Sequence, residues 1–253
     1  MENENISMFD VLIETHAGLD RQGPGSPEMI DKALSYLENV EAIEQVADLG
    51  CGTGGQTLYL AQKLNGSIVG VDQSPDFISK LNENAEKQNL QDRAIGIVAS
   101  MEKLPFEKDE FDLIWSEGAI DSIGFETGLA HWYDFLKKRG YVVVSCPSWL
   151  GDEHPDEVEK FWSEAESGLD TIEYNISVMQ KTGYDLVATF ALPDECWTTN
   201  YFVPREASEK AFQEKYPGNK IVEEYIESSN YEAALYAKYK NYYGYVFYIG
   251  RKI

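Results

Sequence analysis

A glycine-rich turn between a short apolar run and a helical stretch constrains this chain most. Val46, Ala47 and Leu49 lead into glycines at positions 50, 52, 54 and 55, and apolar residues at helical spacing follow from position 56. Glycine adopts positive φ without strain and has no Cβ, so the backbone can lie against a ligand. A strand that turns through such a loop into a helix places a nucleotide-type site at the carboxyl edge of a parallel sheet.

Two acidic residues narrow the class of ligand. Asp72 ends a second apolar run about 20 residues beyond the loop, where such folds place an acid on ribose hydroxyls. Asp48 precedes the first glycine and has no role in the dinucleotide fingerprint, which the loop fits only through Gly55. The pattern favours an adenosine-bearing cofactor other than NAD, and an NAD-dependent oxidoreductase remains an alternative.

The stretch D-L-G-C-G-T-G at residues 48–54 resembles motif I of class I S-adenosylmethionine-dependent methyltransferases. Leu104-Pro105-Phe106, followed by F-D-L-I from Phe111, resembles the same family's segment before its fourth strand. The family often places an acid against the adenine amino group where this chain has Ser100. The resemblance implies S-adenosyl-L-methionine as cofactor and a cofactor-binding set made of Arg21, Asp48, Gly50, Cys51, Gly52, Gly54, Asp72, Gln73, Ser100, Met101 and Glu117.

Four further phrases resemble a bacterial and archaeal small-molecule subgroup of that family. They are R-Q-G-P-G from Arg21, W-S-E-G-A-I from Trp115, I-G-F-E from Ile123 and N-Y-Y-G-Y from Asn241. This resemblance implies a reaction type and a small-molecule methyl acceptor, without identifying the acceptor.

The order of strand-like and helix-like segments indicates an α/β fold. Apolar runs at 44–49, 67–71, 95–99, 111–116, 140–146, 185–192 and 245–249 predict strands. Helices are expected near 27–39, 55–64, 75–88, 125–138, 155–167 and 170–182. Such alternation favours a doubly wound parallel sheet. The resemblance implies seven strands, mostly parallel, with the last strand antiparallel.

We expect a single methyltransferase domain over residues 1–253. Residues 27–192 and 243–253 would form the Rossmann-like core, and residues 1–26 an N-terminal lid. The roughly 50 residues before the last strand exceed an ordinary connection. Residues 193–242 are therefore expected to form a helical cap insertion.

Charge and cysteine content exclude several kinds of partner. The chain has 44 acidic and 21 basic residues, a net charge of −23, and such a field repels nucleic acids and anionic membranes. Its three cysteines match neither a disulfide framework nor a metal site. No apolar run reaches about 18 residues. We expect a cytoplasmic protein without a metal, as a monomer or homodimer.

Methyl transfer is a direct displacement for which the cofactor carries its own activation, so no catalytic diad is required. His16 and Glu117 are the candidates for a catalytic group. Trp149, Trp197, Tyr201 and Phe202 are candidates for an acceptor pocket. A protein that binds S-adenosylmethionine without turnover remains an alternative.

Overall fold

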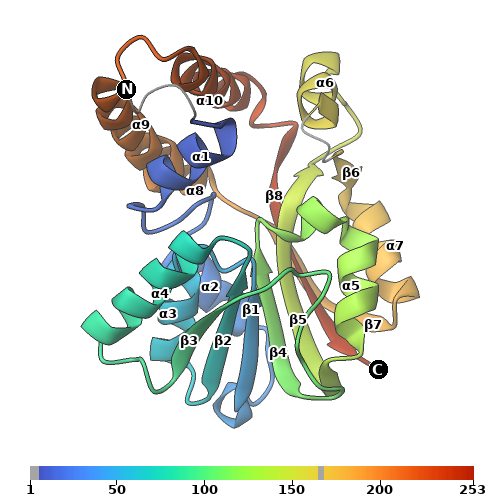
Figure 1. The fold of residues 1–253 in the computed structure, drawn as a ribbon. Helices are drawn as coiled ribbons and strands as arrows, with labels where there is room; N and C mark the ends of the chain where they lie inside the picture. Colours follow the sequence, from blue (N-terminus) through green and yellow to red (C-terminus); the bar gives the residue numbers. More distant parts are fainter. Residues whose placement is uncertain (1–5, 165–167) are drawn as a thin grey trace.

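A computed structural model describes residues 6–164 and 168–253 of the chain (Figure 1). Its centre is an eight-stranded sheet in which seven strands follow the order β3-β2-β1-β4-β5-β8-β7 and β6 pairs only with β5. The strands are β1 (Gln45–Leu49), β2 (Ser67–Asp72), β3 (Ala94–Val98), β4 (Phe111–Glu117), β5 (Leu136–Trp149), β6 (Asp170–Thr171), β7 (Tyr184–Ala191) and β8 (Tyr243–Lys252).

Helices alternate with these strands and then gather before the last one. The α-helices are α1 (Met8–His16), α2 (Pro27–Leu34), α3 (Gly55–Lys63), α4 (Pro75–Lys87), α5 (Phe125–Tyr133), α6 (Asp156–Glu164), α7 (Ile172–Lys181), α8 (Asp194–Trp197), α9 (Val203–Lys215) and α10 (Lys220–Tyr239). Short turns are η1 (Val40–Ala42), η2 (Ile120–Ile123) and the π-helical η3 (Thr198–Phe202).

The expected sheet topology is confirmed. β1 pairs in parallel with β2 and β4, and β3 and β5 extend the parallel sheet on either side. The last strand, β8, lies antiparallel between β5 and β7. The two-residue β6 is an addition to the seven expected strands.

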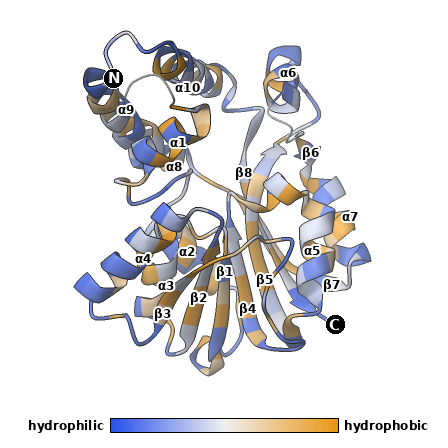
Figure 2. Ribbon diagram, in the orientation of Figure 1, coloured by the Kyte–Doolittle hydropathy of each residue, from blue (hydrophilic) through white to orange (hydrophobic). Residues whose placement is uncertain are grey.

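Alternating side chains on the strands divide the core into two layers. Val46 and Trp115 face one cluster, which includes residues of α2 and α3. Ala47 and Ile114, the neighbouring residues on the same strands, face the other cluster with residues of α5 and α7. Because successive strand side chains point to opposite faces, the apolar runs cover both faces of the sheet. Figure 2 shows the hydrophobic colouring along the central strands.

Two Ser-Pro pairs begin helices α2 and α4. Ser26 Oγ accepts a hydrogen bond from Met29 N at 3.3 Å, and Pro27 opens α2. Ser74 Oγ accepts one from Phe77 N at 3.2 Å at the start of α4. A serine N-cap before a proline satisfies the free amides of the first turn.

The structure differs from the expected element boundaries around residue 136. The expected helix 125–138 ends at Tyr133, and the expected strand 140–146 is longer, as β5. Pairing with β4 decides this, since Phe111 N donates to Phe135 O at 2.9 Å and the ladder shifts register just beyond. Arg139 takes φ of 65° within this irregular stretch. The last three residues of the expected helix 155–167 lie outside the described part of the chain.

Helix α1 and helices α8 to α10 lie together beyond the carboxyl edge of the parallel strands (Figure 1). Ser208 Oγ of α9 donates to Thr15 O at 2.6 Å, and Asn200 Nδ2 of η3 donates to Gly25 O at 3.0 Å. The amino-terminal segment is therefore fastened to the segment before β8. Residues 1–5 of the expected lid lie outside the described residues.

No helix among residues 6–164 and 168–253 has the length and apolar character needed to cross a bilayer.

Candidate functional site

The glycine loop connects β1 to α3 with a backbone that only glycine adopts easily. Gly50, Gly52 and Gly54 have φ of 79°, 53° and 87°. The amides of Gly50 and Cys51 both donate to Val71 O of β2, at 2.8 and 3.0 Å. A Cβ on Gly50 would lie 2.2 Å from Ala119 Cβ. The loop is thus held against the edge of β2 and has no room for side chains at its turn.

Beside this loop lies a cavity of about 450 Å³, a size typical of small-molecule sites. Its wall comes from the glycine loop, the ends of β2 and β4, and the amino-terminal segment. The lining residues are Phe9, Leu12, Ile13, Arg21, Gln22, Gly23, Pro24, Gly50, Gly52, Gln56, Asp72, Gln73, Ser74, Phe77, Met101, Glu117, Gly118, Ala119 and Ser122.

Asp72, on the cavity wall, connects the glycine loop to the turn between β2 and α4. Its Oδ2 accepts from Gly52 N at 3.0 Å and its Oδ1 from Ser74 N at 2.8 Å. Burial raises the pKa of this carboxyl above its ordinary value, although the backbone amides oppose the shift. The carboxylate therefore both orders the glycine loop and faces the cavity.

Asp48 lies fully buried behind the glycine loop, away from the cavity wall. Thr57 Oγ1 donates to its Oδ2, whereas its Oδ1 has no hydrogen-bond partner among the described residues. Burial raises the pKa of this carboxyl to about 7, and the charge of Glu117 adds to the rise. An unpartnered buried oxygen is costly, so this atom is a candidate for contact with a ligand.

Arg21 and Glu117 form an ion pair on the cavity wall, with Nη1 and Oε2 2.8 Å apart. Glu117 Oε1 also accepts from Trp115 Nε1 at 2.8 Å. A Cβ on Gly25 would come within 2.4 Å of Arg21 Nη1. The guanidinium of Arg21 therefore occupies space that a side chain at position 25 would fill.

Gln22 fastens the amino-terminal segment to the glycine loop, and the sequence did not single it out. Its Nε2 donates to Thr53 Oγ1 and its Oε1 accepts from Thr53 N, both at 2.9 Å. A Cβ on Gly52 would come within 2.1 Å of Gln22 Oε1. The only signal in the sequence is its place in the R-Q-G-P-G phrase, since the partners are 31 residues away.

Met101 lines the cavity, and Trp132 Nε1 donates to its carbonyl at 3.3 Å. Ser100, the neighbouring residue, does not reach the wall, and its Oγ accepts from Glu102 N at 3.2 Å.

The structure brings together most of the expected cofactor residues. Those on the cavity wall are Arg21, Gly50, Gly52, Asp72, Gln73, Met101 and Glu117. Those behind or beside it are Asp48, Cys51, Gly54 and Ser100.

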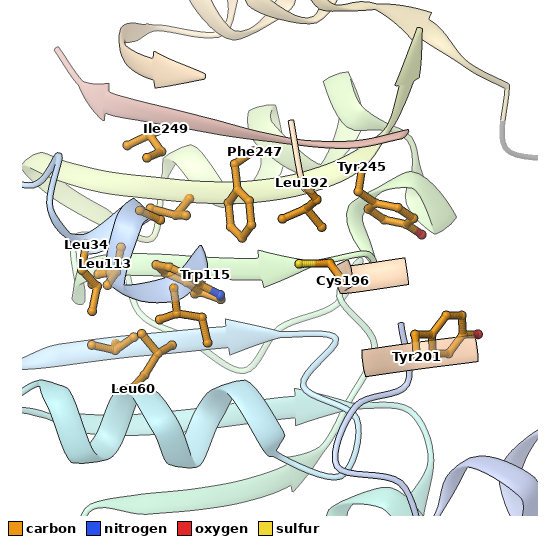
Figure 3. Close-up of a cluster of buried hydrophobic side chains, with 14 of the residues drawn as sticks. Leu34, Leu60, Leu113, Trp115, Leu192, Cys196, Tyr201, Tyr245, Phe247 and Ile249 are labelled. Atoms are coloured by element: carbon orange, nitrogen blue, oxygen red, sulfur yellow. The ribbon is translucent and has the colours of Figure 1, made fainter. Parts of the chain in front are cut away.

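The expected acceptor residues lie apart from this cavity. Trp149, Trp197 and Phe202 belong to the larger core cluster, in which Trp197 stacks on Tyr236 with ring centroids 4.3 Å apart. Tyr201, seen at the edge of that cluster in Figure 3, borders a second cavity together with His16. Their assignment to an acceptor site stays a prediction.

Comparison with known proteins matches the sequence to methyltransferases, and the fold is similar to that of solved methyltransferases. Residues 46–140 match a family described as "Methyltransferase domain". Tocopherol O-methyltransferase of Arabidopsis thaliana is 37% identical over 93 residues, covering 35% of this chain and 27% of the relative. Methyltransferase GfsG of Streptomyces halstedii is 31% identical over 176 residues, covering 68% of this chain and 63% of the relative.

A solved structure of an S-adenosylmethionine-dependent methyltransferase from Geobacter sulfurreducens, in complex with S-adenosyl-L-homocysteine, has a similar fold. It aligns with a TM-score of 0.81 and 18% identity, covering 96% of this chain and 98% of that one. The chain spans about a quarter of the length of the tocopherol enzyme and less than two thirds of GfsG. With the glycine loop, the sheet order and the family match in agreement, this chain carries a class I S-adenosylmethionine-dependent methyltransferase domain.

Proposed function

We propose that this protein transfers a methyl group from S-adenosyl-L-methionine to a small-molecule acceptor. One observation carries the proposal: Gly50, Gly52 and Asp72 meet on the wall of a single cavity, within the segment that matches the methyltransferase family. The cavity volume of about 450 Å³ suits a nucleoside-sized ligand.

The residues present fit this cofactor. The positive φ of Gly50 and Gly52 lets the loop backbone itself line the cavity, where the methionine portion would lie, and Asp72 offers a carboxylate to ribose hydroxyls. The unpartnered Oδ1 of Asp48 would accept from the ammonium group, directly or through water. Met101 would lie on the adenine, since thioethers pack adaptably on aromatic rings, with Ser100 as a weak hydrogen-bond partner.

Five more residues of the expected set complete the site. Gln73 lies next to Asp72 on the same wall, and Arg21 would face the cofactor carboxylate. Glu117 holds that guanidinium in place. Cys51 and Gly54 would act through the backbone of the loop.

S-adenosylmethionine supplies an activated methyl group on a sulfonium, and the protein's task is to position the acceptor and exclude water. We propose that residues 1–26 and 193–242 do this as a lid and cap of one methyltransferase domain. The hydrogen bonds from Ser208 to Thr15 and from Asn200 to Gly25 support a joint role.

The chemistry of the chain supports a small molecule over a nucleic acid as acceptor, because a net charge of −23 repels phosphate backbones. Three buried cysteines that form no disulfide fit the reduced cytoplasm.

Calorimetry with S-adenosylhomocysteine and with NAD tests the proposal. We expect binding of the first and none of the second. Micromolar affinity for NAD without affinity for S-adenosylhomocysteine would establish the oxidoreductase alternative. Incubation with labelled S-adenosylmethionine and a metabolite extract then separates an enzyme from a non-catalytic binding protein: transfer of label to a small molecule is expected, and binding without any transfer would contradict enzymatic activity.

A further inference from the structure

A second cavity of about 400 Å³ lies beside the first, and the two share Leu12 and Gln22 as wall residues. It is bounded by α1, α6, η3, α9 and α10. The remaining lining residues are Met8, His16, Phe161, Tyr201, Arg205, Tyr225, Ser228, Ser229 and Glu232. The shared wall residues make the two cavities direct neighbours, and we call the second one the chamber.

The buried cation of this chamber, Arg205, already has four partners. Its Nη1 donates to Tyr201 Oη at 3.3 Å and also pairs with Glu232. Its Nη2 donates to Ser229 O at 2.7 Å, and its Nε lies 3.5 Å from Glu209 Oε1. Two carboxylates thus surround one guanidinium. Among the described residues that line the chamber, Arg205 is the one arginine or lysine, and these carboxylates balance its charge. Displacing its buried partners for an anionic ligand would be costly.

The hydrogen of Tyr201 is also committed. His16 Nδ1 lies 2.9 Å from Leu12 O, and because a carbonyl only accepts, Nδ1 carries the hydrogen. Nε2 is then an acceptor, and Tyr201 Oη donates to it at 3.3 Å. Burial lowers the pKa of His16 to about 4, so the ring is neutral near pH 7. The hydrogen of Tyr201 is therefore not available to a ligand, and its oxygen, which already accepts from Arg205, offers only further acceptor capacity.

Two other donors of the chamber are used in the same way. Ser229 Oγ donates to Glu209, and Gln22 Nε2 donates to Thr53 Oγ1, to His16 O and to Leu19 O. The polar wall is rich in acceptors, chiefly Tyr201 Oη and the carboxylate of Glu232. Three aromatic rings, from Phe161, Tyr201 and Tyr225, supply the rest of the contact surface. Aromatic faces attract cations.

The backbone around Tyr201 is itself unusual. Residues 198–202 form a π-helical turn between α8 and α9, and such turns occur frequently at functional sites. Tyr201 and Phe202 are both presented from this turn, with the guanidinium of Arg205 4.9 Å from the centroid of each ring.

We propose that this second cavity is the acceptor chamber and that it selects a small amine with an aromatic or aliphatic body. An amine brings the hydrogen-bond donors that Tyr201 and Glu232 lack, and its positive charge suits a wall with carboxylate and aromatic faces. A carboxylate or phosphate finds no uncommitted cation there. This inference rests on the proposed methyl-transfer function.

Three probes of the same ring and different head group test the selection: benzylamine, benzyl alcohol and benzoate. Their affinities are measured by saturation-transfer NMR on the full chain, with and without saturating S-adenosylhomocysteine. We expect benzylamine to bind at least tenfold more tightly than benzoate, with benzyl alcohol between them and no competition from S-adenosylhomocysteine. Equal or tighter binding of benzoate, or displacement of benzylamine by S-adenosylhomocysteine, would overturn the proposal.

Two conservative variants locate the binding. Tyr201→Phe and Glu232→Gln should each weaken benzylamine binding at least fivefold. Glu227→Gln, which removes an exposed carboxylate from the same helix, should leave it unchanged. Unchanged affinity in both chamber variants, with circular dichroism showing the native fold, would refute the assignment. The wild-type probe series needs no variant and decides the selectivity by itself.

Binding of S-adenosylhomocysteine is measured independently of the benzylamine series. The experiments therefore distinguish a failure of the proposed methyl-transfer function from a failure of the amine selectivity. If the chain selects benzylamine but does not bind S-adenosylhomocysteine, the proposed function and the acceptor role of the chamber are wrong, and its selectivity for amines stands. A chain that binds S-adenosylhomocysteine but prefers benzoate has lost only the amine chamber.

Discussion

Arg21 Nη1 lies 2.8 Å from Glu117 Oε2, and this ion pair joins the amino-terminal segment to the end of β4. The side chains are only 11% and 3% exposed. The two residues are 96 positions apart in the chain. The contact closes one side of the cavity beside the glycine loop, so it connects the stability of the amino-terminal segment to the shape of the site.

Breaking this pair should be costly because it leaves a charge in a largely buried place. We expect Glu117→Gln to lower the free energy of unfolding by about 3 kcal/mol. Urea unfolding measures the change. Asp31→Asn, which removes one partner of the exposed Lys63–Asp31 pair, is the matched control and should have a much smaller effect. Equal effects of the two substitutions would show that Arg21 finds water or another partner.

Replacing Asp72 should weaken cofactor binding. We expect Asp72→Ala to reduce affinity for S-adenosylhomocysteine by about 1–3 kcal/mol, the scale of a lost charged hydrogen-bonding group. Part of this loss comes from the glycine loop, because the variant also lacks the carboxylate that accepts the hydrogen bond from Gly52 N. Calorimetry measures it, and Asp76→Ala, an exposed acid four residues along, is the control. An unchanged affinity in a folded variant would place the ribose contact elsewhere.

Asp48 should make stability depend on pH in an unusual direction. Its pKa rises from 3.8 to about 7 on folding, because burial disfavours the charged form. The folded state therefore binds this proton more tightly than the unfolded state, and stability falls as pH increases from about 4 to 7. The side chain of the Asp48→Asn variant does not titrate, so this variant lacks the pH-dependent contribution to stability.

Denaturant unfolding at several pH values compares the two proteins. The stability of the wild type relative to Asp48→Asn should decline between pH 4 and 7 and then level off. All other titrating groups are shared, so they largely cancel in the difference. A difference that stays constant across this range would mean that Asp48 is charged at ordinary pH in the folded state.

The amino-terminal lid should become more protected when the site is filled. We expect amide hydrogen exchange over residues 8–26 to slow in the presence of S-adenosylhomocysteine, because Arg21, Gln22 and Phe9 line the cavity. Gln22→Ala removes the two hydrogen bonds to Thr53 and should speed exchange in the free protein. Identical exchange with and without the ligand would make this segment a packing element only.

Local sequence patterns determined much of the fold. The glycines of residues 50–54, the Ser-Pro helix starts at 26 and 74, and the apolar alternation of the strands each depend on neighbours in the chain. The position of Asp72 follows in the same way, since it ends the strand after the glycine loop. These features need only backbone geometry and burial, so the sequence predicts the alternating α/β fold and the carboxyl-edge site.

The exact element boundaries and the residues that border the cavities depended on contacts between distant segments. Pairing with β4 starts β5 at Leu136, earlier than its own apolar run indicates. Gln22 acquires its role only when the amino-terminal segment docks on the glycine loop. Trp197, expected in a pocket, lies in the core because α8 packs against β8 and α10. By itself, the sequence determined the class of domain and the loop that marks its site. Tertiary packing alone decided which side chains border each cavity, because burial and hydrogen-bond partners arise from residues far apart in the chain.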